Sequence, residues 1–92
     1  MLFRLFIGAD NKTKRLDKKT IMATALKYYP NGFTYYPAAG IWRGGSEKSA
    51  VVEILTETKN QAKVIKLAKE LKKTLNQQAI LLQAVKTAAS FI

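Results

Sequence analysis

The stretch Gly32–Ser49, GFTYYPAAGIWRGGSEKS, joins two parts of the chain in which apolar strands alternate with amphipathic helices. It holds four of the five glycines, the only tryptophan and two of the four tyrosines. Its pattern predicts an extended segment at Phe33–Ile41, with Pro37 at an edge or a bulge, a turn at Arg43–Ser46 and a strand at Lys48–Leu55. Because glycines allow close backbone approach and aromatic rings offer flat faces to a ligand, we expect any functional site to lie here.

The rest of the chain is predicted to form two strands and two helices around this stretch. The expected strands are Leu2–Ile7 and Ala79–Val85, and the expected helices are Lys18–Tyr29, capped by Asp17, and Gln61–Leu75. The resulting order, β-α-β-β-α-β, is that of a single ferredoxin-like domain over residues 1–92. We therefore expect an α+β sandwich with both helices on one face of the sheet.

Each expected helix has an apolar face at helical spacing, which we expect to cover the sheet. The inward residues of the first helix are predicted to be Ile21, Met22, Ala25, Leu26 and Tyr29. Those of the second helix, which Asn60 is expected to cap, are predicted to be Val64, Leu67, Ala68, Leu71 and Leu75.

The expected strands carry apolar residues on both faces, whereas a monomer with one solvated sheet face shows polar alternation. The strand sequences LFRLFI, AVVEIL and AILLQAV show this most clearly. Because soluble monomers rarely expose so large an apolar surface, we expect a homo-oligomer, a trimer, whose subunits pack their open sheet faces together. These faces are expected to carry Val51 or Val52 and Leu81 or Leu82. Glu53, in the middle of a strand, is expected to pair at this subunit interface or to mark the edge of the sheet.

The composition excludes several kinds of chemistry. The 92 residues include no cysteine and no histidine, so disulfides, thiol chemistry, a zinc site and a Ser–His–Asp arrangement cannot be built, and no metal is expected. No apolar run is long enough to cross a membrane, and the first residues lack the features of a signal peptide. We therefore expect a cytoplasmic protein with no membrane partner.

The chain carries a formal charge of +10, from sixteen lysines and arginines against six acidic residues. The lysines gather around the start of the first expected helix and along the second one. Two interpretations are open: a surface that follows the phosphates of nucleic acid, and a solvated helix face that keeps the protein soluble. Because lysine far outnumbers arginine, which favours base recognition, any nucleic-acid binding is expected to be weak and non-specific.

From Gly32 onward, the pattern G-F-T, then A-G-I-W-R-G, then E-K-S before an apolar strand resembles the phage S-adenosylmethionine lyases. The likeness continues through the strand Ala50–Leu55, a helix rich in alanine and leucine, Gln77 and the apolar strand Ala79–Leu82. It spans roughly two thirds of the chain, whereas the first strand and the first helix agree with the family only in type.

The resemblance implies an enzyme that converts S-adenosylmethionine to 5′-methylthioadenosine and L-homoserine lactone without a cofactor. The carboxylate of the substrate attacks the carbon beside its own sulfonium, so no protein nucleophile and no hydrolytic water are needed. A chain without histidine and cysteine is compatible with this reaction. A dry, weakly polar pocket that folds the substrate on itself is expected to accelerate the reaction.

The resemblance also assigns roles within the glycine-rich stretch. Glu47 matches the acidic residue of the family motif and is expected to bind the substrate amino group or to lie beside the sulfonium; the alternative is a solvated carboxylate paired with Lys48. Tyr36, eleven positions earlier, is the second candidate catalytic residue, in contact with the sulfonium or a ribose hydroxyl, or else an ordinary half-buried strand tyrosine. The candidate substrate-binding residues are Trp42, which stacks on adenine or caps the core, Tyr35, Gly40, Gly44 and Gln77.

Two other functions are open from the residues alone. One is a small basic ferredoxin-like nucleic-acid-binding module, with Phe33, Tyr35 and Tyr36 as a stacking platform on one strand. The other is a non-enzymatic phage inhibitor or structural oligomer without a ligand. A steep loss of affinity with salt is expected of the first, whereas the second predicts no thermal stabilisation by methylthioadenosine or S-adenosylmethionine.

Overall fold

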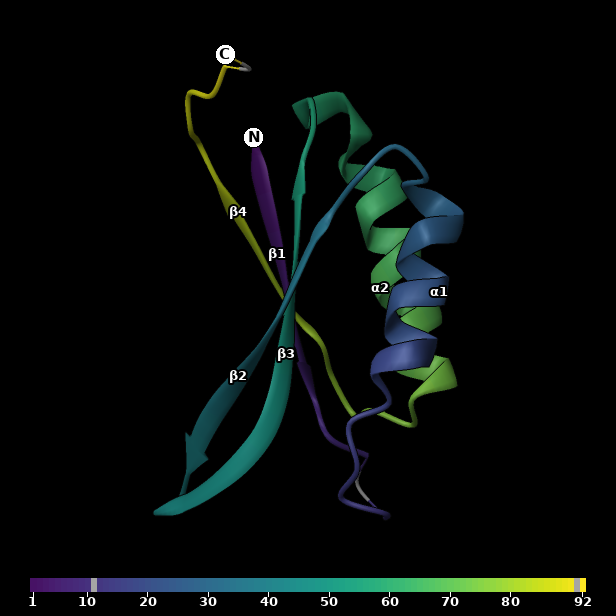
Figure 1. The fold of residues 1–92 in the computed structure, drawn as a ribbon, viewed down its shortest axis with the longest axis vertical. Coiled ribbons are helices and arrows are strands. Elements are labelled where there is room, and N and C mark those ends of the chain that lie inside the picture. Colours follow the sequence, from purple (N-terminus) through teal and green to yellow (C-terminus); the bar gives the residue numbers. More distant parts are fainter. Residues whose placement is uncertain (11, 91) are drawn as a thin grey trace.

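The chain folds as an antiparallel sheet with helices on one face (Figure 1). The computed structural model describes residues 1–10, 12–90 and 92, with the backbone but not the side chain of Trp42. Within these residues, the elements in chain order are β1 (Leu2–Gly8), α1 (Lys18–Tyr28), β2 (Thr34–Trp42), β3 (Gly45–Leu55), a short 3-10 helix (Thr58–Asn60), α2 (Gln61–Thr74) and β4 (Leu81–Val85). The strand order across the sheet is β2-β3-β1-β4, and each neighbouring pair is antiparallel. The predicted ferredoxin-like fold is therefore confirmed.

The two helices begin differently. Asp17 accepts a hydrogen bond from the backbone amide of Thr20 at 3.0 Å, which satisfies one free donor in the first turn of α1. Asn60 precedes α2, but its side chain donates to Thr56 Oγ1 at 2.8 Å and makes no capping bond. The expected cap is therefore present on α1, whereas Asn60 braces the preceding turn.

Each helix buries a narrow stripe against the sheet. The buried residues of α1 are Ile21, Thr24 and Ala25, and those of α2 are Val64, Leu67 and Leu71. Met22 and Leu26 are 38% and 53% exposed, so the prediction that they face inward is wrong. An α-helix turns about 100° per residue, and one further residue carries each of these side chains past the stripe that contacts the sheet.

The core lies between the helices and one face of the central strands β1 and β3. Alternate residues of these strands point toward the helices and are fully or almost fully buried: Phe3, Leu5, Ile7, Ala50, Val52 and Ile54. Leu2–Phe6 of β1 and Ser49–Glu53 of β3 have a neighbouring strand on each side, so their backbone groups can pair in both directions.

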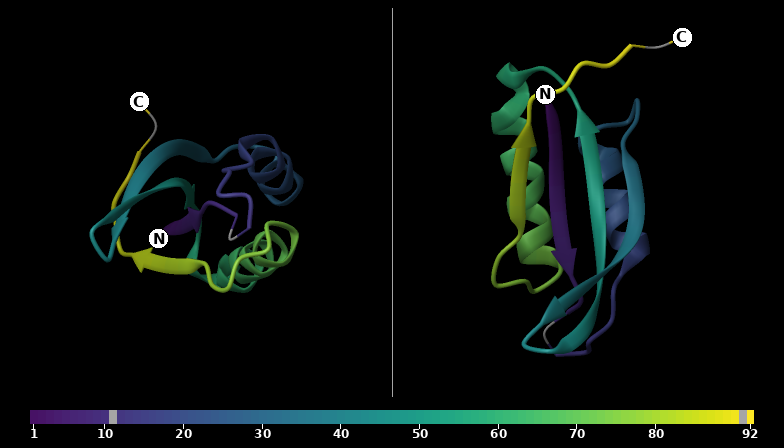
Figure 2. Two further views of the ribbon diagram at one scale, coloured as in Figure 1. Left: turned by 90° about the horizontal axis from the view of Figure 1, so that it is seen from below. Right: turned by 90° about the vertical axis from the view of Figure 1, so that its left-hand side faces the viewer.

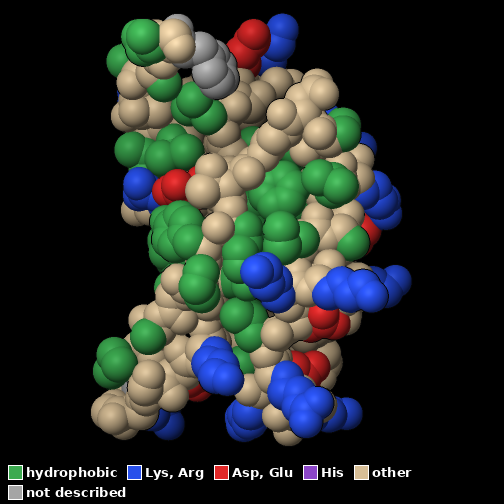
Figure 3. Space-filling model, viewed as in Figure 1, with side chains coloured by type: hydrophobic (Ala, Val, Ile, Leu, Met, Phe, Trp, Pro, Cys, Tyr) green, Lys and Arg blue, Asp and Glu red, His purple; other side chains and the backbone are tan. Residues whose placement is uncertain are grey.

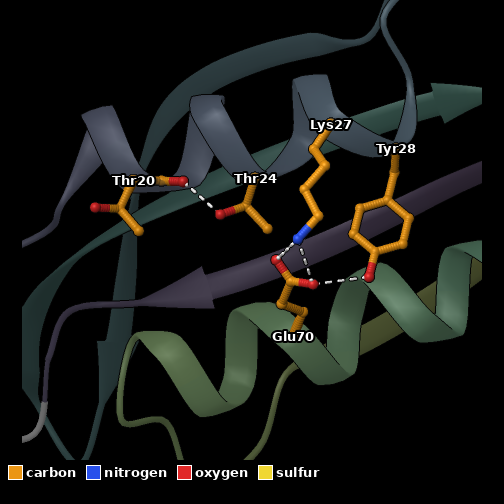
Figure 4. A network of polar contacts seen from close by, with 5 residues as sticks. All are labelled: Thr20, Thr24, Lys27, Tyr28 and Glu70. Atoms are coloured by element: carbon orange, nitrogen blue, oxygen red, sulfur yellow. Dashed lines mark hydrogen bonds and ion pairs between the residues drawn. The ribbon is translucent and has the colours of Figure 1, made fainter.

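A network of polar contacts joins α1 to α2 (Figure 4). Lys27 Nζ on α1 lies 2.8 Å from Glu70 Oε2 on α2, and Tyr28 Oη donates to Glu70 Oε1 at 2.8 Å. These hydrogen bonds, from Lys27 first and Tyr28 second, hold the pKa of the Glu70 carboxyl below its ordinary value. The network fixes α1 beside α2 at the edge of the core.

In the part of the chain that the structure describes, no helix covers the opposite face of the sheet (Figure 2, right). The register places Phe6 between Val51 of β3 and Leu81 of β4 on this face. Leu81 is 64% exposed, whereas Val51 is only 3% exposed beside its cross-strand neighbours Phe6 and Tyr36. The expectation of two apolar sheet faces is confirmed, and the register selects Val51 and Leu81, in place of Val52 and Leu82, for the open face.

Candidate functional site

The far end of the β2–β3 hairpin borders a hollow that contains Glu47. β1 ends at Gly8, which pairs with Ser49, so the β3 residues before Ser49 have β2 on one side and no strand on the other. The loop between β1 and α1 takes the place of that strand. A hollow of about 380 Å³ lies there, lined by Ala9, Asp10, Lys14 and the β3 residues Gly45, Ser46, Glu47 and Lys48.

A two-residue turn sets the geometry of the hairpin. Arg43 and Gly44 connect the strands with φ of 49° and 79°, the left-handed conformation typical of a tight hairpin turn, which glycine adopts without strain. The resulting register places Gly40 directly opposite Glu47. A side chain added at Gly40 would meet nothing within 4 Å, so space is open beside this part of β3. Gly40 thus leaves open space beside the backbone opposite Glu47, whereas Gly44 lies in the tight turn.

The other wall of the hollow is a loop held by its own hydrogen bonds. Asp10 Oδ1 accepts from the backbone amides of Lys12 at 2.7 Å and Thr13 at 2.9 Å. These bonds, that of Thr13 first, hold the pKa of the Asp10 carboxyl below its ordinary value, so it stays ionised at neutral pH. Lys14, with φ of 60°, donates its backbone amide to the Asp10 carbonyl. Asp10 and Lys14 of this loop therefore line the hollow, and one oxygen of the Asp10 carboxylate is bound within the loop itself.

Gln77, which is far from this loop in sequence, forms a hydrogen bond with its first residue. Its Nε2 donates to the carbonyl oxygen of Ala9 at 2.9 Å, and a side chain added at Gly8 would come within 3.3 Å of its Oε1. Gln77 follows α2, so this bond ties the end of α2 to the wall of the hollow. The structure gives Gln77 a supporting position behind Ala9, one residue from Asp10.

A second cluster lies in the middle of the open sheet face. Arg4 Nε donates to Glu53 Oε2 at 2.7 Å, and Tyr36 Oη donates to the same oxygen at 3.2 Å. Arg4 also donates to Gln83 Oε1 at 3.4 Å, so polar groups from β2, β3, β1 and β4 form one line across the strands. Partial burial first, and the Glu53 carboxylate second, raise the pKa of the Tyr36 phenol.

This pairing corrects the expectation for Glu53 at the sheet edge. β3 lies between β2 and β1, so Glu53 is on an interior strand and pairs with Arg4 of its own chain. The sequence did carry a signal for this pair: Arg4 and Glu53 are single, opposite charges that interrupt two apolar strands. Cross-strand neighbours of opposite charge stabilise a sheet, and the register puts these two directly opposite each other.

The structure separates the two predicted catalytic residues within one chain. Tyr36 pairs with Val51 and Gly40 with Glu47, so Tyr36 and Glu47 share a sheet face but lie four positions apart along the ladder. Four strand residues correspond to about 13 Å. Tyr36 is hydrogen-bonded to Glu53, whereas Glu47 lines the hollow.

The remaining candidates lie on the other side of the sheet or outside the described side chains. Tyr35 faces the helices and packs against the core, with Lys18 Nζ 5.5 Å from its ring centroid. Phe33 also packs against the core, so Phe33 and Tyr35 do not form an open stacking platform with Tyr36. The expected role of the Trp42 side chain lies outside the described part of the structure.

Neither a metal cluster nor a membrane span was found in the described part of the chain. Among residues 1–10, 12–90 and 92, no group of three or more metal-ligating side chains lies close enough to hold an ion. No helix in that part of the chain is long and apolar enough to cross a membrane.

Comparison with known proteins places the chain among solved structures of the same fold. No protein-family model matches the sequence, and no curated protein matches it. A phage S-adenosylmethionine lyase in the apo state superposes with a TM-score of 0.69 at 18% identity, covering 88% of this chain and 75% of that one. A DUF3240 family protein from Shewanella baltica OS155 gives a TM-score of 0.62 at 18% identity, over 99% of this chain and 97% of that one. The periplasmic divalent cation tolerance protein CutA from Archaeoglobus fulgidus gives 0.59 at 14% identity, over 99% and 88%. At these identities the likeness shows a shared fold.

Proposed function

We propose that this protein is an S-adenosylmethionine lyase that releases 5′-methylthioadenosine and L-homoserine lactone. The observation that carries the proposal is the hollow at the hairpin, where Asp10 and Glu47 lie with Lys14 and Lys48. Only six acidic residues occur in the chain, and two of them line this hollow. S-adenosylmethionine has two positive centres, the sulfonium and the amino group, and one carboxylate, so its charges complement this lining.

The fold comparison and the sequence pattern also support this proposal. The phage lyase superposes over 88% of the chain, and the motif E-K-S that resembles the lyase family begins at Glu47, in the wall of the hollow. The volume of about 380 Å³ lies within the usual range for sites that bind small molecules.

The proposed reaction needs little chemistry from the protein. A carboxylate oxygen of the substrate attacks the carbon next to the sulfonium, the carbon–sulfur bond breaks, and its electron pair stays on sulfur as the neutral thioether. Opposite charges disappear as the reaction proceeds, so a site that replaces water around them favours the transition state. Glu47 holds the cationic part of the substrate, and the open backbone at Gly40 lets the substrate approach β3.

The oligomer belongs to the same proposal. The open sheet face carries Phe6, Tyr36 and Leu81, and a homotrimer packed through these faces removes this apolar surface from water. Oligomerisation also offers a way to bring a Tyr36 from one subunit nearer to a Glu47 from another. We place the enzyme in the cytoplasm of an infected bacterium, where loss of S-adenosylmethionine counteracts methylation-dependent restriction.

Incubation of the purified protein with S-adenosylmethionine tests the proposal directly. We expect chromatography to detect methylthioadenosine and homoserine lactone in equal amounts, with homoserine absent from the initial products. Thermal stabilisation of the protein by methylthioadenosine gives an independent measure of binding. Absence of both cleavage and stabilisation contradicts the proposal and favours the non-enzymatic alternatives.

A further inference from the structure

Lysine and arginine side chains from two distant segments meet at one end of the molecule. The first segment is the loop before α1 with the first turn of that helix, and the second is the last part of α2. Because α1 and α2 run in opposite directions, the start of α1 and the end of α2 lie side by side (Figure 1 and Figure 2, left). The resulting group, called the basic end below, consists of Lys12, Lys14, Arg15, Lys18, Lys19, Lys69, Lys72 and Lys73. All eight side chains are exposed.

Contacts within the fold hold these segments together. Gln77, just after α2, donates to the carbonyl oxygen of Ala9 at the start of the loop. A hollow of about 470 Å³ is lined by loop residues from Asp10 to Asp17 and by Thr74 and Leu75 at the end of α2. A neighbouring hollow is lined by Lys69, Lys72, Lys73, Asn76 and Gln77. The basic end is therefore one continuous surface, and Figure 3 shows Lys and Arg side chains gathered along the lower part of the molecule.

The acidic residues do not neutralise this surface. Three of the six, Glu53, Glu57 and Glu70, pair with Arg4, Lys59 and Lys27, which are outside the basic end. Three carboxylates lie near the basic end: Glu47 lines a hollow together with Lys14, and Asp10 and Asp17 accept hydrogen bonds from the backbone of the loop and the first turn of α1. Among the described residues, no ion pair within 4.0 Å involves the eight cations, and eight cations against three nearby carboxylates leave an excess of five positive charges on this surface.

Helix stability does not explain all of these cations. Lys72 and Lys73 lie in the last turn of α2, where the helix dipole favours positive charge. Lys18 and Lys19 lie in the first turn of α1, where the dipole disfavours it, and that turn contains no acidic residue. Lys18 and Lys19 therefore lie where the helix dipole disfavours them, beside further cations from the loop and from α2. This placement indicates that the positive potential of the surface serves binding and not helix stability.

We propose that the basic end, which shares Lys14 with the hollow of Glu47, binds the phosphate backbone of nucleic acid, without base recognition, as an activity distinct from the lyase reaction. The group is dominated by lysine, which neutralises phosphates as a point charge, and the arginine forks that read guanine are represented by Arg15 alone. Tyr35, which could stack on a base, faces the core. The two shorter dimensions of the molecule are 26 and 22 Å, so its cross-section is as wide as about six to eight nucleotides of a stacked strand at about 3.4 Å each.

Two variants with the same net charge test this proposal. One replaces Lys18, Lys19, Lys72 and Lys73 with glutamine; the control replaces Lys59, Lys63, Lys66 and Lys86, outside the basic end, in the same way. Each has four positive charges fewer than the wild type and a formal charge of +6. Neither variant changes a residue that lines the hollow of Glu47. Circular dichroism confirms that both variants fold before binding is compared.

Fluorescence anisotropy with labelled oligothymidylate, and with a mixed-sequence single strand, gives the affinity between about 50 and 200 mM salt. We expect the two wild-type Kd values to be similar. The basic-end variant should bind at least about tenfold more weakly at low salt, with a salt slope smaller by about 2 to 3, because about 0.7 counterions are released per phosphate contact on a single strand. The control should change the affinity by less than about threefold.

Three results overturn the proposal. Equal weakening of the two variants means that net charge alone drives binding. A strong preference for one base sequence means that the surface reads bases. Binding to phosphatidylglycerol vesicles without binding to either oligonucleotide identifies a membrane surface as the partner. Loss of lyase activity in the Glu47→Gln variant with unchanged oligonucleotide binding separates this proposal from the proposed function.

Discussion

Arg4 and Glu53 form an ion pair at 2.7 Å in the middle of the open sheet face, on neighbouring interior strands. Around them the same face is apolar, with Phe6 and Leu81 toward one end of β1 and Leu2 and Leu55 toward the other. Tyr36 donates to the same oxygen of Glu53, so the charges are satisfied within the chain. A face of this kind can be covered by a second subunit without leaving an unpaired charge.

The pair should behave as a unit when the protein assembles. We expect Arg4→Met and Glu53→Met each to lower the Tm and weaken assembly, because each leaves one unpaired charge on a surface that assembly buries. The double variant should recover most of both losses, because two apolar side chains then replace the pair. Thermal denaturation and light scattering of all four proteins give the coupling between the residues. If the changes in Tm and in assembly of the double variant equal the sums of those of the two single variants, Arg4 and Glu53 are not energetically coupled.

The open sheet face should determine the oligomeric state. We expect light scattering of the wild type at micromolar concentration to give three times the chain mass of 10.3 kDa. Leu81→Lys should yield monomers, because it places a charge in the proposed interface. Leu26→Lys is the matched control: Leu26 is similarly exposed, but lies on α1, and its substitution should leave the trimer intact. A monomeric wild type contradicts the prediction.

Glu47 should be needed for turnover and not for the fold. Glu47→Gln keeps the size and polarity of an exposed side chain, so the free energy of unfolding should change by no more than about 1 kcal/mol. Lyase turnover should fall by a factor on the order of 10², because an electrostatic contact to the cationic substrate is lost. Methylthioadenosine, which lacks both charges, should still bind. Glu57→Gln, which removes an exposed carboxylate outside the hollow, should keep the wild-type rate. Cleavage at the wild-type rate by Glu47→Gln would exclude the assigned role.

The contact between α1 and α2 should weaken in acid. Hydrogen bonds from Lys27 and Tyr28 lower the pKa of Glu70 from its ordinary value of 4.5, so the folded state binds fewer protons at this group than the unfolded state. The stability that this group adds is present above pH 4.5 and is lost as the pH falls through the lowered pKa. Between about pH 5 and pH 3, the Tm of Glu70→Gln should therefore decrease less with falling pH than the Tm of the wild type.

The double variant Lys27→Met/Glu70→Gln provides the control for this pH effect. Its Tm should follow the same pH dependence as that of Glu70→Gln alone, because Lys27 acts on acid stability through the Glu70 carboxylate. A wild-type pH dependence retained in Glu70→Gln would assign the acid sensitivity to other groups.

Local sequence patterns were sufficient to predict the elements and their order. The predicted strand Leu2–Ile7 and helix Lys18–Tyr29 differ from β1 and α1 by one residue at one end, and the predicted final strand Ala79–Val85 begins two residues before β4. These boundaries depend on caps, turns and the spacing of apolar residues, which act over a few residues of the chain. The hairpin was predicted less closely: β3 begins at Gly45, three residues before the predicted strand Lys48–Leu55, so the predicted turn Arg43–Ser46 is reduced to Arg43 and Gly44. A two-residue turn lets the strands pair up to its edges, which the sequence pattern did not specify.

The sequence by itself therefore determined the ferredoxin-like order, the two-faced apolar strands and the position of Glu47 in a glycine-rich hairpin. Only the tertiary structure decided that Arg4 pairs with Glu53, that Glu47 and Tyr36 lie apart within one chain, and that lysines from the first and last thirds of the chain meet at one end. These outcomes depend on sheet register and on the antiparallel arrangement of the helices. Both are set by contacts between residues far apart in sequence, which hydrophobic periodicity over a few residues does not specify.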